Sequence, residues 1–297
     1  MSAEGIIKEI KVNVKYLHDM TGYGIMSADR IAAETNMEGT MRELNIKGKQ
    51  IGAGRPFVCV PVMEEDAEEI KRQISELCES RADVIEWRVD AFGAYRDCNA
   101  VRAVLESIGP MLKEKLFLYT FRSKLQGGMG DAEGGLLRDL QELAAESGCV
   151  DLIDVEFFAE KSPASAIRRL QNAGVYVLSS HHDFLETPDP GVMKMLLERM
   201  RDGGADIVKL AVMPKNHQDV LNLLAVTASF AEENPDTPIV TMSMGKLGSI
   251  SRLCGESFGS CMSFGAFKKA SAPGQYGMEE LTGILDLIHQ SGVSGED

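Results

Sequence analysis

The chain is poor in aromatic side chains and has no surplus of positive charge. Phe, Trp and Tyr make up 6% of its 297 residues, and Trp occurs once. Asp and Glu outnumber Lys and Arg by 45 to 31, which gives a net charge of −14 and an isoelectric point near 4.9. Nucleic acid requires a basic surface, so this balance argues against nucleic acid as a partner. It does not exclude a small anionic ligand, provided that arginines gather locally.

Paired cysteines and long apolar segments are also missing. The six cysteines are scattered, with no CxxC pair and no histidine at zinc spacing. This pattern is typical of reduced thiols in the cytoplasm and predicts no metal site. No apolar run approaches the roughly 18 residues of a membrane span. The N-terminal segment lacks the apolar core of a signal peptide. We therefore expect a cytoplasmic protein that has no membrane partner.

What the sequence does contain is a regular alternation of strand-like and helix-like segments. Short apolar runs typical of β-strands recur at residues 57–62, 83–88, 116–121, 151–156, 175–179, 206–211, 238–243 and 257–265. Segments with helical period lie at residues 65–77, 96–112, 136–147, 164–173, 192–201, 218–232 and 278–288. Strands that alternate with helices indicate a parallel sheet, and eight such units are the number in a (β/α)8 TIM barrel.

The barrel is predicted to carry an N-terminal hairpin and an extension. Residues 44–51 are typical of a hairpin that turns at Gly48. Residues 1–40 form the extension, with a strand-like alternation at 10–16 and a helix predicted over 27–37, so residues 41–297 make the barrel domain. A doubly wound sheet is the alternative, but no GxGxxG fingerprint is present. The glycines at 128–135 lack that spacing and indicate a flexible loop.

One lysine, Lys209, lies inside the apolar run 206–211. A strand this apolar is normally buried on both faces, and burial lowers the pKa of a lysine. Only the neutral amine attacks a carbonyl, so a buried lysine suits a Schiff-base enzyme. The alternative is a lysine at the strand end that reaches solvent or pairs with a carboxylate.

Polar side chains collect where the predicted strands end. Glu86 and Arg88 end the second run, Arg122 follows the third, and His181 and His182 follow the fifth. Active sites of (β/α)8 barrels lie at the C-terminal ends of the strands, so these groups are expected to converge. Each has a structural alternative: Glu86 and Arg88 as an ion pair, or His182 as a loop histidine with its hydrogen bonds satisfied.

Motifs along the chain resemble one family. They are EWRVD at 86–90, TFRS at 120–123, SHHDF at 180–184, ADIVKLAVMP at 205–214, TMSM at 241–244, ISRL at 250–253 and ASAPGQ at 270–275. In this order they resemble the type I 3-dehydroquinate dehydratases, the Schiff-base dehydroquinases of the shikimate pathway. The resemblance extends from about residue 44 to 288. It implies a hydro-lyase that dehydrates 3-dehydroquinate to 3-dehydroshikimate, without a cofactor and as a homodimer.

The resemblance also implies a role for each site residue. Lys209 would form the Schiff base and His182, which directly precedes Asp-Phe, would be the general acid and base, with His181 a spectator. The expected substrate contacts are Glu86, Arg88 and Arg122 at the ring hydroxyls, Arg252 at the carboxylate, Ser271 and Gln275 on a closing loop, and Met242 and Met244 at the ring.

Two positions depart from the family pattern, and two other functions stay open. Gln126 replaces a glutamate that supports the histidine, so Gln126, or Asp131 or Glu133 nearby, is the candidate support. Pro61 stands where some members have a serine. A class I aldolase-like lyase would share Lys209 but would not explain Arg252, Ser271 and Gln275. A sensor that binds dehydroquinate without turning it over would need neither Lys209 nor His182.

Overall fold

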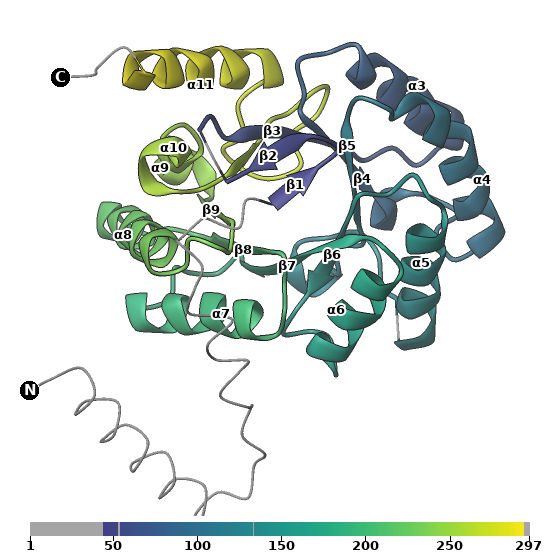
Figure 1. Ribbon diagram of the computed structural model, residues 1–297, viewed down its shortest axis with the longest axis horizontal. Coiled ribbons are helices and arrows are strands. Elements are labelled where there is room, and N and C mark those ends of the chain that lie inside the picture. Colours follow the sequence, from purple (N-terminus) through teal and green to yellow (C-terminus); the bar gives the residue numbers. More distant parts are fainter. Residues whose placement is uncertain (1–43, 53, 133, 294–297) are drawn as a thin grey trace, which may run out of the picture. The chain divides into compact units, whose positions relative to one another are not determined.

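The computed structural model describes residues 44–52, 54–132 and 134–293 (Figure 1). The strand and helix predicted at 10–16 and 27–37 lie outside the described residues. The division of the chain into 1–40 and 41–297 therefore stays a prediction. Among the described residues, no helix combines the length and the apolar character that crossing a bilayer requires.

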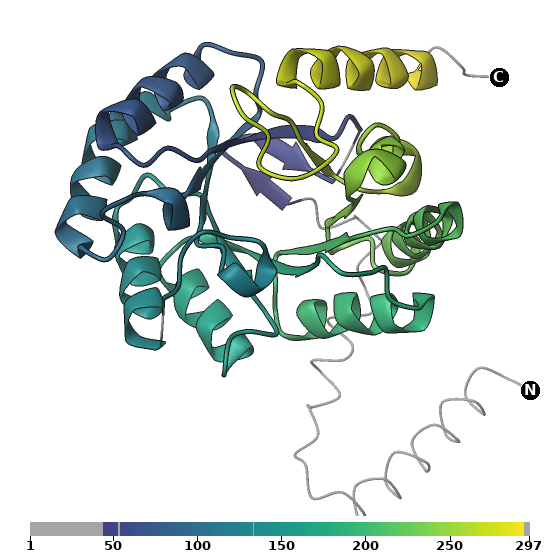
Figure 2. The same cartoon turned by 180° about the vertical axis from the view of Figure 1, so that it is seen from behind.

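Parallel strands form the centre of the fold. They are β3 (Phe57–Val62), β4 (Val84–Arg88), β5 (Leu116–Thr120), β6 (Leu152–Glu156), β7 (Tyr176–Asp183), β8 (Ile207–Val212), β9 (Ile239–Ser243) and β10 (Met262–Phe264). They make one eight-stranded sheet in the order β10-β3-β4-β5-β6-β7-β8-β9. Helices surround this sheet on its outer side (Figures 1 and 2). The predicted (β/α)8 barrel is confirmed.

Most connections between strands contain a helix. The long helices are α3 (Ala67–Cys78), α4 (Cys98–Ile108), α5 (Gly134–Glu146), α6 (Pro163–Asn172), α7 (Pro190–Asp202), α8 (His217–Glu233) and α11 (Met278–Val293). The short ones are η1 (Val89–Ala91), η2 (Gly109–Met111), η3 (Lys124–Gln126), α9 (Gly245–Gly248), η4 (Ser249–Arg252) and α10 (Gly255–Phe258). The link from β9 to β10 holds only the short helices α9, η4 and α10.

Side chains alternate between two buried layers. In β8, Val208 and Leu210 join the layer between sheet and helices, whereas Ile207 and Ala211 join the layer inside the barrel. Successive strand residues face opposite sides, so Lys209 faces the interior. The same count puts the last interior positions of β4, β6 and β7 at the C-terminal mouth of the barrel. The period of two therefore decides which polar groups meet there.

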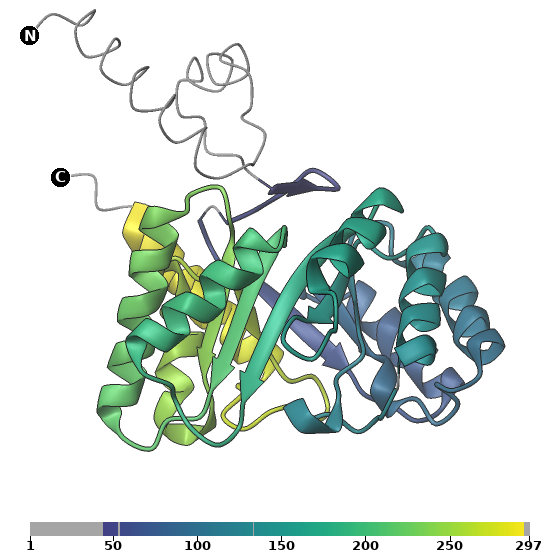
Figure 3. The same cartoon turned by 90° about the horizontal axis from the view of Figure 1, so that it is seen from below.

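The hairpin predicted at residues 44–51 is present as β1 (Leu44–Ile46) and β2 (Lys49–Ile51). Its two central residues, Lys47 and Gly48, have φ angles of 51° and 74°, as a tight hairpin turn of this hand requires. Ile46 and Ile51 pack into the interior layer. Figure 3 shows the hairpin and the loop before α11 at opposite ends of the barrel, so the hairpin is remote from the C-terminal mouth.

The last strand, β10, is bonded differently to its two neighbours in the barrel, β3 and β9. β10 pairs with β3 through a parallel ladder. Toward β9 there is one isolated bridge, between Ile239 and Ser260. Serine hydroxyls accept from the β9 backbone instead: Ser260 Oγ lies 3.0 Å from Thr241 N, and Ser251 Oγ lies 2.8 Å from Ser243 N.

Two predicted boundaries are wrong. The last run, predicted as a strand over 257–265, is a strand only at Met262–Phe264, because α10 occupies its start. Gly259 ends α10 at a φ of 88°, and a Cβ there would lie 2.4 Å from Ala231 Cβ. Conversely, β7 continues to Asp183, so His181 and His182 lie in a strand and not in the loop that follows it.

Candidate active site

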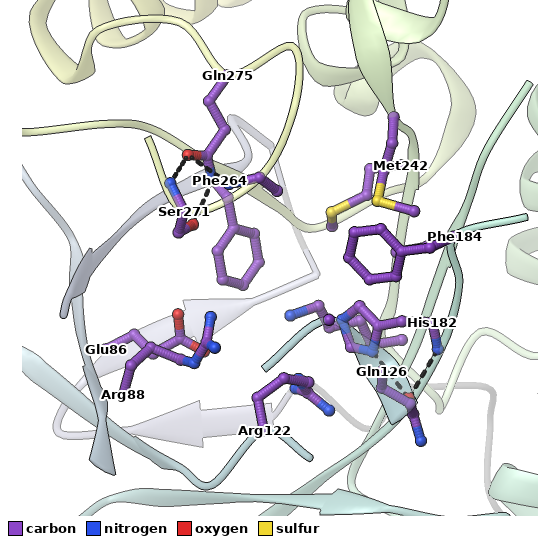
Figure 4. A pocket seen from close by; sticks show the side chains of 15 residues that line it. Glu86, Arg88, Arg122, Gln126, His182, Phe184, Met242, Phe264, Ser271 and Gln275 are labelled. Atoms are coloured by element: carbon purple, nitrogen blue, oxygen red, sulfur yellow. Dashed lines mark hydrogen bonds between the residues drawn. The ribbon is translucent and has the colours of Figure 1, made fainter. Parts of the chain in front are cut away.

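One cavity lies at the C-terminal mouth of the barrel (Figure 4). It is lined by Glu86, Arg88, Arg122, Gln126, Gly127, His182, Phe184, Lys209, Ala211, Met242, Met244, Phe264, Ser271, Ala272 and Gln275. It encloses about 450 Å³, part of it open to solvent. All but one of the predicted site residues line it, and the exception is Arg252.

Lys209 reaches the cavity from β8. Its side chain is 3% exposed, and Nζ lies 3.9 Å from the centre of the Phe264 ring. Within the described part of the chain it has no hydrogen bond or ion pair. Burial lowers its pKa, although the carboxylates of Glu86 and Asp154 act in the opposite direction. Lys209 therefore neither reaches solvent nor pairs with a carboxylate, and a larger share of neutral amine is available than on an ordinary lysine.

His182 faces the same cavity from β7 and is held by Gln126 (Figure 4). Gln126 Oε1 lies 2.8 Å from the backbone N of His182 and 3.1 Å from its Nδ1. The backbone N–H can only donate, so the glutamine atom facing it is the oxygen, and Nδ1 must then carry the ring proton. This leaves Nε2 as the unprotonated nitrogen of the neutral ring.

Electrostatics favour the neutral form of that imidazole. Burial lowers the pKa of His182 well below its usual value, and the cations Arg122, Lys209 and Arg88 lower it further. Gln126 carries no charge that would oppose them. Asp131 is bonded to Lys124 Nζ at 2.6 Å, and Glu133 lies outside the described residues.

His181 does not line the cavity. It faces the outer layer, because neighbouring residues of a strand point to opposite sides. Its ring contacts that of Phe158, with centroids 5.3 Å apart. This position agrees with the prediction that His181 is a spectator.

Arg88 and Arg122 line the cavity with their charges already paired. Arg88 binds Asp90 through two contacts of 2.8 Å, and the described structure has no ion pair between Arg88 and Glu86. Arg122 lies 2.7 Å from Asp154 and 2.9 Å from Glu156. Burial alone would lower the pKa of Arg122, but these two carboxylates outweigh it and raise the pKa. Both guanidinium groups are thus fixed by the protein itself.

The site residues predicted from the sequence did not include the three acids that pair with these arginines. Asp90, Asp154 and Glu156 all have buried side chains. A signal for Asp154 and Glu156 was present, since they occupy alternate positions at the end of β6. The sequence did not show that Arg122, more than thirty residues away, would be their partner. Ser180 completes the cluster by donating to Asp154 Oδ1 at 2.7 Å and accepting from Arg122 Nη1 at 2.9 Å.

Arg252 lies behind the cavity wall. Its Nη1 lies 3.7 Å from Met242 Sδ, and its Nη2 donates to Pro273 O at 3.2 Å. The side chain is 1% exposed, and its buried Nε has no partner in the described structure. No carboxylate among the described residues pairs with it, and burial lowers its pKa to about 10, although Tyr276 opposes this.

The segment before α11 covers one side of the cavity. Gln275 Oε1 accepts from Ser271 N at 2.7 Å, and Gln275 Nε2 donates to Ser271 Oγ at 2.8 Å (Figure 4). Met242 and Met244 form apolar wall, whereas Pro61 is buried in β3 and does not line the cavity. Among the described residues, no group of three or more His, Cys, Asp or Glu side chains could hold a metal ion.

A (β/α)8 barrel that gathers a buried lysine, a histidine and two arginines at its C-terminal mouth has the arrangement of a barrel enzyme. The model of the family Type I 3-dehydroquinase matches residues 58–292. This chain belongs to that family.

Similar proteins agree with this assignment. The 3-dehydroquinate dehydratase of Clostridioides difficile (strain 630) is 40% identical over 251 residues, which cover 84% of this chain and 98% of that protein. The 3-dehydroquinate dehydratase of Listeria monocytogenes serotype 4a (strain HCC23) is 43% identical over 253 residues, covering 84% and 99%.

Solved structures give the same result. The type I 3-dehydroquinate dehydratase from Clostridium difficile with covalent modified comenic acid matches with a TM-score of 0.82 at 40% identity, covering 85% of this chain and 100% of that chain. The 3-dehydroquinate dehydratase from Geobacillus kaustophilus HTA426 matches with a TM-score of 0.80 at 33% identity, covering 84% and 96%.

Proposed function

We propose that this chain is a 3-dehydroquinate dehydratase of the shikimate pathway that works through an imine on Lys209. Family membership and relatives of about 40% identity along the whole barrel support the reaction. They favour it over the aldolase-like alternative. The observation that carries the mechanism is Lys209 itself: a buried amine, unpaired in the described structure, that lines the same cavity as His182.

The chemistry requires an electron sink. The substrate is a ring ketone with a hydroxyl on the β-carbon, and the enolate formed by losing an α-proton is poorly stabilised. Lys209 Nζ attacks the ketone carbon and water leaves, which gives an iminium. Removal of the α-proton then gives a neutral enamine, and the enamine electrons expel the β-hydroxyl. Hydrolysis of the product iminium returns ketone and amine.

His182 is proposed to move the proton in both directions. Its Nε2 is the free base of the neutral ring, because the proton on Nδ1 faces Gln126. After taking the α-proton, the imidazolium can donate it to the departing hydroxyl as water forms. The lowered pKa of His182 keeps the base form populated near neutrality and makes the imidazolium a stronger acid than an ordinary one.

Arg252 is proposed to bind the substrate carboxylate. Of the three arginines predicted for the site, it is the one without an acidic partner in the described structure, and its orphaned Nε is a donor that a carboxylate would satisfy. Substrate entry must displace Met242 or the loop bearing Ser271 and Gln275, since Arg252 lies behind them. Glu86 and the remaining N–H groups of Arg88 and Arg122 then face the ring hydroxyls.

Reductive trapping tests the proposal. Borohydride added to protein and dehydroquinate is expected to fix the ligand mass on the peptide that contains Lys209 and to abolish activity. Dehydroshikimate formation by untreated protein is measured in parallel. Trapping elsewhere, or intact activity without trapping, contradicts the imine mechanism. Absence of turnover with tight dehydroquinate binding would favour the sensor alternative. The homodimer and the cytoplasmic location stay predictions.

A further inference from the structure

Asp90 is a buried carboxylate that binds residues of the active-site cavity without lining it. Four N–H groups donate to it, two to each oxygen. Oδ1 accepts from Arg88 Nε at 2.8 Å and from the backbone N of Arg122 at 3.1 Å. Oδ2 accepts from Arg88 Nη2 at 2.8 Å and from the backbone N of Met129 at 2.9 Å. Burial alone would raise the pKa of Asp90, but these donors outweigh it and lower the pKa, so the carboxylate is charged.

The two backbone donors lie at the two ends of one turn. Arg122 precedes η3 and Met129 follows it, so Asp90 bridges the base of the segment 123–128. The chain beyond Met129 also lies close to Asp90, because a Cβ on Gly130 would be 3.1 Å from Asp90 Cβ and 2.8 Å from Phe121 Cζ. A carboxylate that accepts from both ends of a segment fixes those ends relative to each other.

The same turn carries the support of His182. Gln126 N donates to Ser123 O at 3.0 Å, and Gly128 N donates to the same oxygen at 2.8 Å. From this position Gln126 Oε1 faces both the backbone N and Nδ1 of His182 (Figure 4). The place of the Gln126 side chain therefore depends on how the turn is closed, and Asp90 joins the two ends of that turn.

We propose that Asp90 is a positioning residue for His182. By joining the ends of the turn, it keeps Gln126 Oε1 against Nδ1, so that the ring proton stays on Nδ1 and Nε2 stays free. The same carboxylate fixes the guanidinium of Arg88, which is proposed to face the ring hydroxyls. One acid outside the cavity thus sets the relative positions of the base and of a substrate contact. Its effect on turnover rests on the proposed function, whereas its effect on the tautomer does not.

The substitution Asp90→Asn separates the two ends of the turn. An amide has one oxygen and one NH2 group, and in the protein each carboxylate oxygen serves one backbone N–H. Whichever way the amide is turned, its NH2 group faces either Arg122 N or Met129 N, and that end is released. The matched control is Asp154→Asn. Asp154 is equally buried and lies 2.7 Å from Arg122 Nη2, but in the described structure no backbone N–H of the turn donates to it.

The first measurement reads the tautomer of His182 without substrate. The chain has five histidines, so NMR of the protein with isotope-labelled histidine is assigned by the signal that His182→Ala removes. Wild type and Asp154→Asn are expected to carry the proton on Nδ1, and Asp90→Asn to show both tautomers. If Asp90→Asn does not fold, the double variant Arg88→Met, Asp90→Asn replaces it, because it leaves no buried arginine without its acid.

The second measurement is kinetic. Asp90→Asn should lower kcat by about 10 to 100-fold, because only molecules with a free Nε2 can take the proton, while borohydride still traps the imine on Lys209. In a Gln126→Leu background, Asp90→Asn should lower kcat little further, since both changes remove the same support. Lys124→Met, which breaks the exposed ion pair of the turn with Asp131, should leave kcat unchanged.

Five results overturn the positioning role. They are a proton on Nε2 in wild type, an unchanged tautomer in a folded Asp90 variant, an equal change in Asp154→Asn, full turnover by Asp90→Asn, and effects of Asp90→Asn and Gln126→Leu on kcat that multiply. Wild type that does not turn over dehydroquinate contradicts the proposed function alone. The tautomers of wild type, Asp90→Asn and Asp154→Asn then still decide whether Asp90 positions His182.

Discussion

The cationic side chains on the two sides of the active site differ in whether a carboxylate of the protein pairs with them. At the ends of β4 and β5, Arg88 and Arg122 are each bonded to carboxylates of the protein. On β8 and in the segment after β9, Lys209 and Arg252 have no acidic partner in the described structure. The two arginines on the paired side already have their ion pairs before any ligand binds. Lys209 and Arg252, on the unpaired side, can still form an interaction with a ligand.

This difference distinguishes cations with a structural role from cations that are expected to act on the ligand. A buried cation without a partner is costly, and a protein retains one mainly where function uses it. A paired cation is stable and is held at a fixed distance from its neighbours. We therefore expect the two unpaired groups to make the covalent bond and the ion pair with the substrate, whereas Arg88 and Arg122 have only their remaining N–H groups to offer.

The largest effect is expected from removing the unpaired amine. Lys209→Met should lower kcat by about 10⁴-fold or more, as for other covalent nucleophiles, and should abolish borohydride trapping. Stability should not fall, because a methionine replaces a buried charge that had no partner. Turnover, trapping and thermal unfolding are measured beside Lys215→Met, a surface control. A destabilised but active Lys209→Met protein would reverse the comparison.

Next in size is the loss of the histidine. His182→Ala should reduce kcat by about 10² to 10⁴-fold, the range for a general acid and base, while the imine can still be trapped. His181→Ala, which changes the other face of β7, is the matched control and should be mild. The opposite pattern in kcat would show that the catalytic proton passes through His181.

The same substitution at two arginines tests the comparison directly. Arg122→Met leaves Asp154 and Glu156 buried without their cation and should cost about 3 to 5 kcal/mol of unfolding free energy. Arg252→Met strands no acid, so its stability should change little while KM rises by about 10 to 100-fold. Arg252→Lys should also raise KM, since an ammonium lacks the two-point fork. Denaturant unfolding and steady-state kinetics of all three variants decide this.

The smallest effect is a shift of pH dependence. A carboxylate at position 126 stabilises the imidazolium, so Gln126→Glu should raise the pKa of His182. The base form is then lost at a higher pH, and the acidic limb of the pH–rate profile moves upward. Wild type, with its lowered His182 pKa, should stay active to lower pH. Asp131→Asn should leave the limb in place, because Asp131 is bonded to Lys124. If Gln126→Glu leaves the acidic limb unchanged, the pKa of a group other than His182 determines the position of that limb.

The sequence predicted the parts of the fold that depend on local pattern. Periods of two and of 3.6 locate strands and helices, and the same period of two puts Lys209 and His182 on the interior face. Pairing of charges is not local: Arg122 meets Asp154 only after β5 and β6 lie side by side. The short last strand also escaped prediction, because the close contact of Gly259 with Ala231 of α8 belongs to tertiary packing.

The seam between β9 and β10 is the one junction between neighbouring barrel strands that has no ladder in the described structure. The other neighbouring strands are joined by ladders of two to six residue pairs, whereas serine hydroxyls and one bridge make this connection. A closed barrel with fewer backbone hydrogen bonds at one junction is expected to deform first at that junction. Arg252 lies between β9 and β10, and the loop before α11 follows β10. Lys209 and His182 lie on β8 and β7, which are joined by a ladder of six residue pairs. We therefore expect the wall that must admit the ligand to move more easily than the strands that carry Lys209 and His182.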